Sequence, residues 1–244
     1  MSDGKTRFHV FFTPHELGDA SVKGKGVVVV DVLRFGTTLA RAFEMGADLV
    51  IPVASTEDVT RLASTLDRKQ IVLCGERDGV RIEGYGLGNS PEAYSEEAVM
   101  GKTLVMTTTN GTASVARAEG AKEILVASLV NLHAVVSVLT ADLEWIVLCS
   151  GRRGRFALED ALCAGAIVAG LRERGIKPSL NDAGRSAEFL FRSAGDDLPR
   201  ILAGTESGEL LHDLGCADDI AFCARVDSIP IVPRVQDGRI PRPE

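Results

Sequence analysis

Aromatic residues are scarce in this chain, and no long apolar or basic run is present. Phe, Trp and Tyr make up 5% of the 244 residues, and the formal net charge is −7 at pH 7. Few aromatic residues and a negative balance are not typical of a nucleic-acid-binding protein. No apolar run reaches the roughly 18 residues that a membrane-spanning helix needs, and no apolar export signal stands near Met1. The sequence therefore predicts neither a nucleic-acid partner nor a membrane partner.

Cysteine and histidine show none of the spacings that build disulfide or zinc sites. The five cysteines are odd in number and scattered, mostly within apolar runs, so a disulfide framework is not expected. The four histidines form no HxH or HExxH arrangement, and no Walker or DxDx[TV] motif occurs. These absences predict a cytoplasmic location. They also direct attention to carboxylates, arginines and hydroxyls as the residues that could carry chemistry.

Four consecutive valines at residues 27–30 mark the segment around which the chain is organised. A run of β-branched residues without polar alternation predicts a strand buried on both faces, as in a parallel α/β sheet. Asp31 and Arg34 follow it directly, and helical spacing then begins at Thr37. Ligands bind at the carboxyl ends of strands in such sheets. We therefore expect Asp31 to hold a hard cation and Arg34 a phosphate or sulfonate. The alternative is a salt bridge between the two that closes the loop.

A repeat of about 75 residues divides much of the chain. The sequence Ile-Val-Leu-Cys at residues 71–74 recurs at 146–149 (146 − 71 = 75), and Gly36-Thr37 coincides with Gly111-Thr112 at the same shift. A pattern of strand, turn, helix, strand, helix and strand thus occurs twice, at about 27–79 and about 103–154. We expect a three-layer α/β/α fold with a mostly parallel sheet, two related halves and a helical C-terminal third.

Further elements follow from the apolar periodicity and from turn residues. Strands are expected at residues 8–12, 48–53 and 71–74, and helices at 56–66, 157–174, 183–194, 206–213 and 217–226. Two prolines cross residues 229–235, which predicts an extended edge segment. The tail, residues 236–244, is expected to be loosely held.

Residues 107–112 (Thr-Thr-Thr-Asn-Gly-Thr) form the turn that corresponds to Asp31 in the second half. Hydroxyls, the Asn110 amide and Gly111 at a helix start would form a cradle for an oxyanion. The segment could equally be an Asn-Gly turn with a threonine cap. The same two alternatives hold for Glu76 and Arg77, which lie either beside the Asp31 strand end or in a solvated turn.

Two further motifs precede or open the long helix at 157–174. Glu159 and Asp160 lie in its first turn, where acidic residues stabilise the helix dipole; beside the Asp31 strand end, one of them would complete a Mg²⁺ site. Residues 149–155 spell C-x5-R, the context of a phosphocysteine phosphatase with Cys149 as nucleophile. Leu148 stands where that signature has histidine, however, and the repeat copy at Cys74 lacks the arginine, so packing is the favoured role of these cysteines.

Five short motifs follow one another in a fixed order along the chain. They are Asp31-Val-Leu-Arg-Phe-Gly-Thr-Thr38, Gly75-Glu-Arg77, Gly88-Asn-Ser-Pro91, Thr109-Asn-Gly-Thr112 and Leu158-Glu-Asp160. With the pattern around Ser207, Gly208, Leu211, Gly215, Asp219, Cys223 and Pro233, this ordered set resembles the 2-phosphosulfolactate phosphatase (ComB-like) family. The resemblance covers nearly the whole chain and implies a single unit over residues 1–244.

The resemblance implies a Mg²⁺-dependent hydrolase that converts (2R)-2-phospho-3-sulfolactate into 3-sulfolactate and phosphate, a step in the route to coenzyme M. Mg²⁺ would be held by Asp31 with Glu76 or Asp160, and the catalytic candidates are Asp31, Arg34, Glu76 and Asn110. The substrate, a small phosphorylated anion, would be bound by Arg34, Thr37, Thr38, Arg77, Asn89, Asn110, Gly111, Thr112 and Arg152. The competing hypotheses are a cysteine phosphatase that uses Cys149 and an anion-binding regulatory module without turnover. Homodimer formation is left open.

Overall fold

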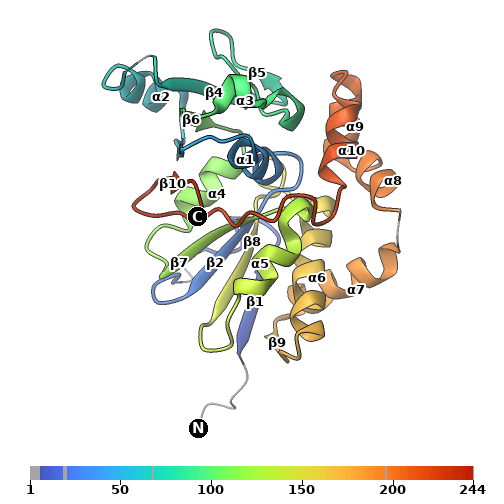
Figure 1. Cartoon of the computed structure of the whole chain (residues 1–244). Helices are drawn as coiled ribbons and strands as arrows, with labels where there is room; N and C mark the ends of the chain where they lie inside the picture. The colour runs from blue at the N-terminus through green and yellow to red at the C-terminus, as the bar shows by residue number, and fades with distance from the viewer. Residues whose placement is uncertain (1–5, 19–20, 68, 196, 244) are drawn as a thin grey trace.

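The strands form two sheets that lie one above the other in Figure 1. The computed structural model describes residues 6–18, 21–67, 69–195 and 197–243. Sheet 1 is wholly parallel and has the order β7-β2-β8-β1-β9. Its strands are β1 (Arg7–Phe11), β2 (Gly26–Val30), β7 (Glu123–Ala127), β8 (Trp145–Cys149) and β9 (Ser179–Leu180).

Sheet 2 has the order β10-β3-β6-β4-β5, with a parallel centre and an antiparallel strand at each edge. Its strands are β3 (Leu49–Pro52), β4 (Ile71–Arg77), β5 (Val80–Arg81), β6 (Thr103–Thr107) and β10 (Ile240–Pro241). The mixed α/β class expected from the sequence is confirmed, but the parallel strands are divided between two sheets. The tail also differs from its expected loose state, because β10 pairs with β3.

Ten α-helices and two 3₁₀ turns are present in the described part of the chain. The helices are α1 (Phe35–Glu44), α2 (Thr56–Ala63), α3 (Glu96–Val99), α4 (Gly111–Arg117), α5 (Leu132–Val138), α6 (Leu158–Glu173), α7 (Asp182–Ala194), α8 (Leu198–Ala203), α9 (Glu206–Asp213) and α10 (Ala217–Cys223). The 3₁₀ turns are η1 (Pro91–Ala93) and η2 (Leu129–Asn131). No helix among these is long and apolar enough to cross a membrane.

The valines of β2 are fully buried because sheet 1 is covered on both faces. Val28 and Val30 contribute to a core shared with α5, α6 and α7, whereas Val27 and Val29 face a second core shared with α1, α4 and sheet 2. Figure 1 shows α1 and α4 between the two sheets. The run of valines therefore reflects burial on both sides, as its lack of alternation predicts.

The first strand of each half of the chain lies between two strands of the other half. In sheet 1, β2 lies between β7 and β8; in sheet 2, β6 lies between β3 and β4. Parallel strands end at the same edge of a sheet, so β2 and β8 bring the segments after Val30 and Cys149 together. In the same way, β4 and β6 bring Glu76 and the segment after Thr107 together.

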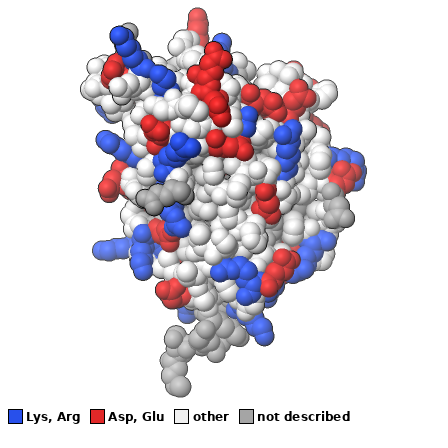
Figure 2. Space-filling view, in the orientation of Figure 1, with Lys and Arg blue, Asp and Glu red and all other residues white. Residues whose placement is uncertain are grey.

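The surface carries charges of both signs. On the face shown in Figure 2, Lys and Arg side chains are interspersed with Asp and Glu side chains. Residues 229–235, expected at a sheet edge, run beside β7, where the Val126 amide donates to the Pro233 carbonyl at 3.0 Å and the Val235 amide to the Ile124 carbonyl at 2.9 Å.

Candidate active site

A cavity of about 60 Å³ lies where strand ends of the two sheets meet. Its walls come from the segments after β2 and β8 of sheet 1, from the ends of β4 and β6 of sheet 2, and from α9. Six of the residues predicted from the sequence line it: Asp31, Arg34, Glu76, Asn89, Asn110 and Arg152. The cavity therefore collects carboxylates, guanidinium groups and amides from positions far apart in the chain.

The Asp31 carboxylate is fixed by the start of α1. Its Oδ1 accepts a hydrogen bond of 3.0 Å from the Phe35 amide, and the side chain is only 6% exposed. Burial raises the pKa of Asp31 to about 7, the Phe35 amide lowers it, and the negative charges of Glu76 and Glu159 raise it further. The cost of an ionised Asp31 would fall if a cation shared the cavity. A buried carboxylate with a raised pKa at a cavity marks a candidate functional site.

Asp160 joins the two strand-end segments of sheet 1. Its Oδ1 accepts the Val32 amide and its Oδ2 the Gly151 amide, each at 2.9 Å. It does not line the cavity, and burial together with the charges of Asp31 and Glu159 raises its pKa well above the usual range. Asp160 thus holds the loops that carry Asp31 and Arg152 and lies behind the site.

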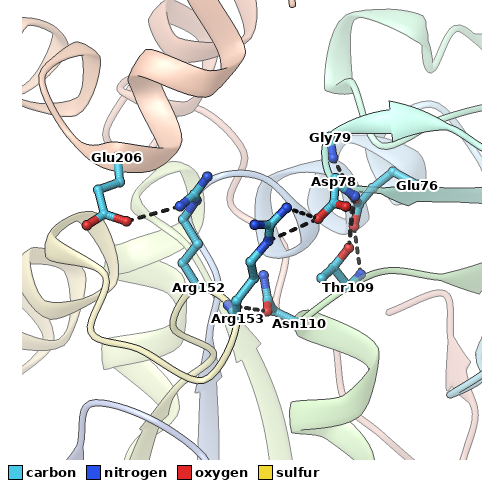
Figure 3. Close-up of polar contacts among 8 residues, drawn as sticks. All are labelled: Glu76, Asp78, Gly79, Thr109, Asn110, Arg152, Arg153 and Glu206. Atoms are coloured by element: carbon cyan, nitrogen blue, oxygen red, sulfur yellow. Dashed lines mark hydrogen bonds and ion pairs between the residues drawn. The ribbon is translucent and has the colours of Figure 1, made fainter.

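Glu76 plays the corresponding part at the end of sheet 2 (Figure 3). Its carboxylate accepts the Thr109 amide and the Gly79 amide, both at 2.7 Å, and the Thr109 hydroxyl at 3.2 Å. The two bonds from Thr109 tie the end of β4 to the segment after β6, and the Gly79 bond closes the turn between β4 and β5. Glu76 is buried yet lines the cavity, as Asp31 does.

Arg34 forms the floor of the cavity with Asp219, a residue of α10. Nη1 of Arg34 donates to Oδ2 of Asp219 at 2.6 Å, and Nη2 donates to the Gly79 carbonyl at 2.8 Å. The two side chains are 4% and 3% exposed, and the Ser90 hydroxyl donates to the other Asp219 oxygen. Arg34 therefore pairs with Asp219 and not with Asp31, which settles the salt-bridge alternative considered for that loop.

Two consecutive arginines form the rim of the cavity (Figure 3). Arg152 donates to Glu206 of α9 at 3.0 Å. Arg153 donates twice to Oδ1 of Asp78, at 3.0 and 2.5 Å, and its backbone amide donates to Oδ1 of Asn110 at 2.9 Å. The rim pairs differ from the floor pair in exposure, because the Arg153 and Asp78 side chains are 57% and 60% exposed.

Asn89 places an unsatisfied polar atom at the cavity. The side chain is 5% exposed and lines the cavity, and its Oδ1 has no hydrogen-bond partner in the described part of the chain. A buried polar group without a partner is costly unless a ligand supplies one. An amide that turns its NH₂ group toward the cavity would offer a donor to an anion.

Five predicted substrate-binding residues do not line the cavity. The Thr37 hydroxyl bonds Val32 and Ser128, and the Thr38 hydroxyl bonds the Asn89 carbonyl. Arg77 donates to the Glu76 carbonyl and the Thr107 hydroxyl, while Thr112 and Thr108 cap each other. At Gly111, an added Cβ would lie 2.5 Å from the Phe35 ring, so this glycine allows α4 to approach α1. These residues shape the walls from behind.

Sequence reasoning did not assign roles to several residues that the structure places at the cavity. They are Asp78, Gly79, Arg153, Ser207 and the leucines Leu33, Leu210 and Leu211, with Asp219 behind them. Thr108 and Thr109 also line the cavity, and they belong to the turn whose hydroxyls were predicted to cradle an oxyanion. A signal existed for Arg153, which lies within a motif singled out for its chemistry. Ser207, Leu211 and Asp219 belong to the pattern that carries the family resemblance, but their place near the cavity depends on tertiary packing.

Cys149 is enclosed in the core of sheet 1. It is fully buried, and burial, with the charge of Asp160 next, raises the pKa of its thiol well above 9. It does not line the cavity, and Arg155 lies exposed in a tight turn that bonds back to Arg152. A phosphocysteine mechanism needs an accessible thiolate. This environment disfavours that hypothesis.

Two carboxylates at the cavity could serve as ligands for Mg²⁺. In the described part of the chain, no three His, Cys, Asp or Glu side chains are grouped so as to hold a metal ion by themselves. Mg²⁺ is commonly held by one or two carboxylates together with water and substrate phosphate oxygens. Asp31 and Glu76, both buried and both at the cavity, fit that requirement.

Comparisons with known proteins point to one family. The family model of 2-phosphosulpholactate phosphatase matches residues 11–238. A protein of Caldanaerobacter subterraneus is 35% identical, over 93% of this chain and 94% of its own length. Proteins of Symbiobacterium thermophilum and Thermotoga maritima are each 38% identical over 89% of this chain, covering 94% and 92% of their own lengths. All three carry the name probable 2-phosphosulfolactate phosphatase.

Proposed function

Because the chain belongs to the 2-phosphosulfolactate phosphatase family, we propose that it hydrolyses (2R)-2-phospho-3-sulfolactate to 3-sulfolactate and phosphate. The chain would then be a phosphoric monoester hydrolase acting in a coenzyme M type of pathway. The observation that carries the proposal is the cavity in which two buried carboxylates, Asp31 and Glu76, lie with the Arg34 guanidinium. Phosphoryl transfer depends chiefly on positioning and charge stabilisation, and this set of groups provides both.

Mg²⁺ is the proposed cofactor, with Asp31 and Glu76 as its ligands and Asp160 as the residue that positions the Asp31 loop. The placement of Asp31 and Glu76 supports this assignment, because both carboxylates are buried and line the cavity. Burial raises the pKa of Asp31 to about 7, and a cation in the cavity would lower it again. Bound Mg²⁺ would supply charge neutralisation at the phosphoryl oxygens. The ionised carboxylates orient that charge, and their backbone hydrogen bonds keep the site assembled.

The remaining lining residues would bind and orient the substrate. Arg34 has donors beyond the two that bond Asp219 and Gly79, and it is held rigidly enough to fix the phosphate. The NH₂ groups of Asn110 and Asn89 would add neutral donors. Neutral donors matter because a site of arginines alone would hold the product as tightly as the transition state.

A duplication is the proposed origin of this arrangement. Three observations support it: the element order strand, helix, strand, helix and strand occurs in β2–β4 and again in β6–β8, the first strand of each copy lies between the second and third strands of the other copy, and the pairing registers match. In sheet 2, Thr103 pairs with Leu49 on one side and Ile71 on the other. In sheet 1, Val27 pairs with Ile124 and Ile146 in the same way. Asp31 and Thr108 then follow equivalent strands and both line the cavity, so the proposed site would lie between the two copies.

A cytoplasmic location is proposed on the basis of the cysteines. All five are free thiols in the structure, and Cys74 and Cys149 lie in separate cores, one in each sheet. Free buried thiols persist most readily in a reducing compartment.

Phosphate release from (2R)-2-phospho-3-sulfolactate tests the proposed function. The purified chain should release phosphate with Mg²⁺, lose activity with EDTA, and recover it when Mg²⁺ is restored. Calorimetric titration with Mg²⁺ gives a second readout, in which Asp31→Asn and Glu76→Gln should both weaken binding. Full activity in metal-free buffer would contradict the role of Mg²⁺, and no release under any condition would contradict the phosphatase assignment.

A further inference from the structure

The rim pair Arg153–Asp78 spans the mouth of the cavity from one sheet to the other (Figure 3). Arg153 belongs to the loop after β8 of sheet 1, and Asp78 to the turn between β4 and β5 of sheet 2. Both line the cavity. The side chains meet through two hydrogen bonds to one carboxylate oxygen, at 3.0 and 2.5 Å. The second oxygen of Asp78 takes no part in this contact.

The backbones of both residues are anchored to the cavity wall. The Arg153 amide donates to Oδ1 of Asn110 at 2.9 Å, and the Asp78 amide donates to the Thr109 hydroxyl at 3.3 Å. Both residues have positive φ angles, +50° and +52°, and both lie in tight turns, next to Gly154 and Gly79. The structure therefore fixes where the two side chains begin while leaving their charged ends in solvent.

An exposed ion pair of this kind is exchangeable. The side chains are 57% and 60% exposed, and solvent screening leaves such pairs only a small net stability. The floor arginine differs, since Arg34 and Asp219 are almost fully buried and their separation would leave a charge without solvent or partner. An incoming anion can therefore displace Asp78 from Arg153 far more readily than it can displace Asp219 from Arg34.

We propose that Arg153 is the docking residue for the acidic group of the substrate that lies farthest from the phosphate, and that Asp78 occupies this position until the substrate replaces it. The inference rests on the proposed function, which places the phosphate beside Asp31, Glu76 and Arg34. A sulfonate or carboxylate then extends toward the rim and reaches a guanidinium that already points across the mouth. Asp78 keeps Arg153 in that orientation while the site is empty.

This arrangement makes Arg153 a determinant of specificity. A ligand with a remote acid exchanges one anion for another on Arg153 and gains the docking contact. Inorganic phosphate has no such group, leaves the Arg153–Asp78 pair intact, and gains nothing from the rim. The Asp78 carboxylate thereby selects against small anions, because it repels any that approach Arg153 without enough contacts to replace it.

The test is equilibrium binding of two probes, 3-sulfolactate and inorganic phosphate, measured by calorimetry in Mg²⁺ buffer. Arg153→Gln should weaken 3-sulfolactate binding by about 10-fold or more, the scale of a lost charged hydrogen bond, and should leave phosphate binding within about 2-fold. Asp78→Asn should tighten 3-sulfolactate binding by about 2- to 5-fold, because it removes a competitor of surface-pair strength. Asparagine accepts the positive φ angle at this position, so the turn should be kept.

The double variant Asp78→Asn/Arg153→Gln decides whether the two residues act together. Its affinity for 3-sulfolactate should equal that of Arg153→Gln alone, because Asp78 matters only as a competitor for Arg153. The matched controls are Asp182→Asn and Arg185→Gln, which make the same charge changes in an exposed ion pair of 2.8 Å on α7. Neither control should change the binding of either probe by more than about 2-fold.

Three results would overturn the inference: weaker 3-sulfolactate binding in Asp78→Asn, a gain from Asp78→Asn that persists without Arg153, or equal losses of 3-sulfolactate and phosphate binding in Arg153→Gln. The binding experiment needs no turnover. A chain that shows the expected pattern but releases no phosphate from 2-phospho-3-sulfolactate would support the docking role and contradict the proposed function. A chain that releases phosphate but lacks the expected binding pattern would support the proposed function and contradict the docking role of Arg153.

Discussion

The floor and the rim of the cavity use the same pair of chemical groups in opposite ways. Arg34 and Asp219 meet at 2.6 Å and are almost excluded from water, whereas Arg153 and Asp78 meet at 2.5 Å with more than half of each side chain exposed. Distance is nearly equal in the two pairs, so burial alone separates them. A buried pair holds a fixed geometry because breaking it is costly. An exposed pair can exchange partners at little cost.

The largest expected effect comes from breaking the floor pair. Asp219→Asn should lower the free energy of unfolding by about 3–5 kcal/mol, because it leaves the Arg34 charge buried without its partner. Asp78→Asn at the rim should lower it by less than about 1 kcal/mol. Urea denaturation of the two variants beside the parent chain measures both values. Similar losses at the two positions would show that burial does not separate floor from rim.

Catalysis should depend on the floor together with the segment after β6. Arg34→Ala and Asn110→Ala should each cost about 2–4 kcal/mol in kcat/KM, the scale of losing a preorganised donor. Their combined loss should be smaller than the sum if both act on one phosphoryl group. Arg34→Lys serves as a control, because it keeps the charge but not the planar fork. Strict additivity in the double variant would argue against a shared group.

The ionisation of Asp31 should appear as a pH dependence of stability in EDTA buffer. Its folded pKa of about 7 lies above the usual value of 3.8, so between these values the folded state binds more protons than the unfolded state and stability falls as pH rises. Asp31→Asn removes this loss and keeps the acceptor for the Phe35 amide. The free energy of unfolding of Asp31→Asn should exceed that of the parent by almost nothing at pH 4 and by at most about 4 kcal/mol at pH 8. A difference that is constant with pH would contradict the raised pKa.

Cys149 should contribute least to activity. Cys149→Ser should keep kcat/KM within about threefold of the parent, because the thiol is buried, protonated and away from the cavity, although a buried hydroxyl will lower stability by about 1–3 kcal/mol. Phosphate release and thermal unfolding, measured on the same sample, separate the two effects. Complete loss of turnover in a folded variant, with a phosphocysteine trapped in the parent, would establish the cysteine mechanism.

The local parts of the fold could be predicted because they depend on neighbours in sequence. The valine run gave β2, and the apolar spacing after residue 157 gave α6 within a residue at each end. The division of parallel strands between two sheets could not be predicted, because any two buried strands satisfy the same apolar pattern. Helix α8 was also missed, since its six residues carry too short a periodicity to detect.

The candidate site likewise contains residues that could be predicted from the sequence and residues that could not. Asp31 and Glu76 could be placed because charged residues that follow a buried strand stand out in the sequence. Asp219 could not be paired with Arg34, since 185 residues separate them and a carboxylate on a short helix gives no local signal. Thr37 and Thr112 show the converse: hydroxyls beside a predicted site can serve backbone capping instead of ligand contact.

The interleaving of the two sheets has a consequence for how the chain is synthesised. β2 leaves the ribosome long before β7 and β8, its partners on either side. Likewise, β3 and β4 are synthesised before β6, the strand that lies between them. Neither sheet can complete its centre until most of the chain has emerged, so we expect fragments that end before residue 103 to remain unfolded and prone to aggregation. The same interleaving should make the two sheets unfold in one step, since β2–β4 and β6–β8 each contribute a strand that lies between two strands of the other group.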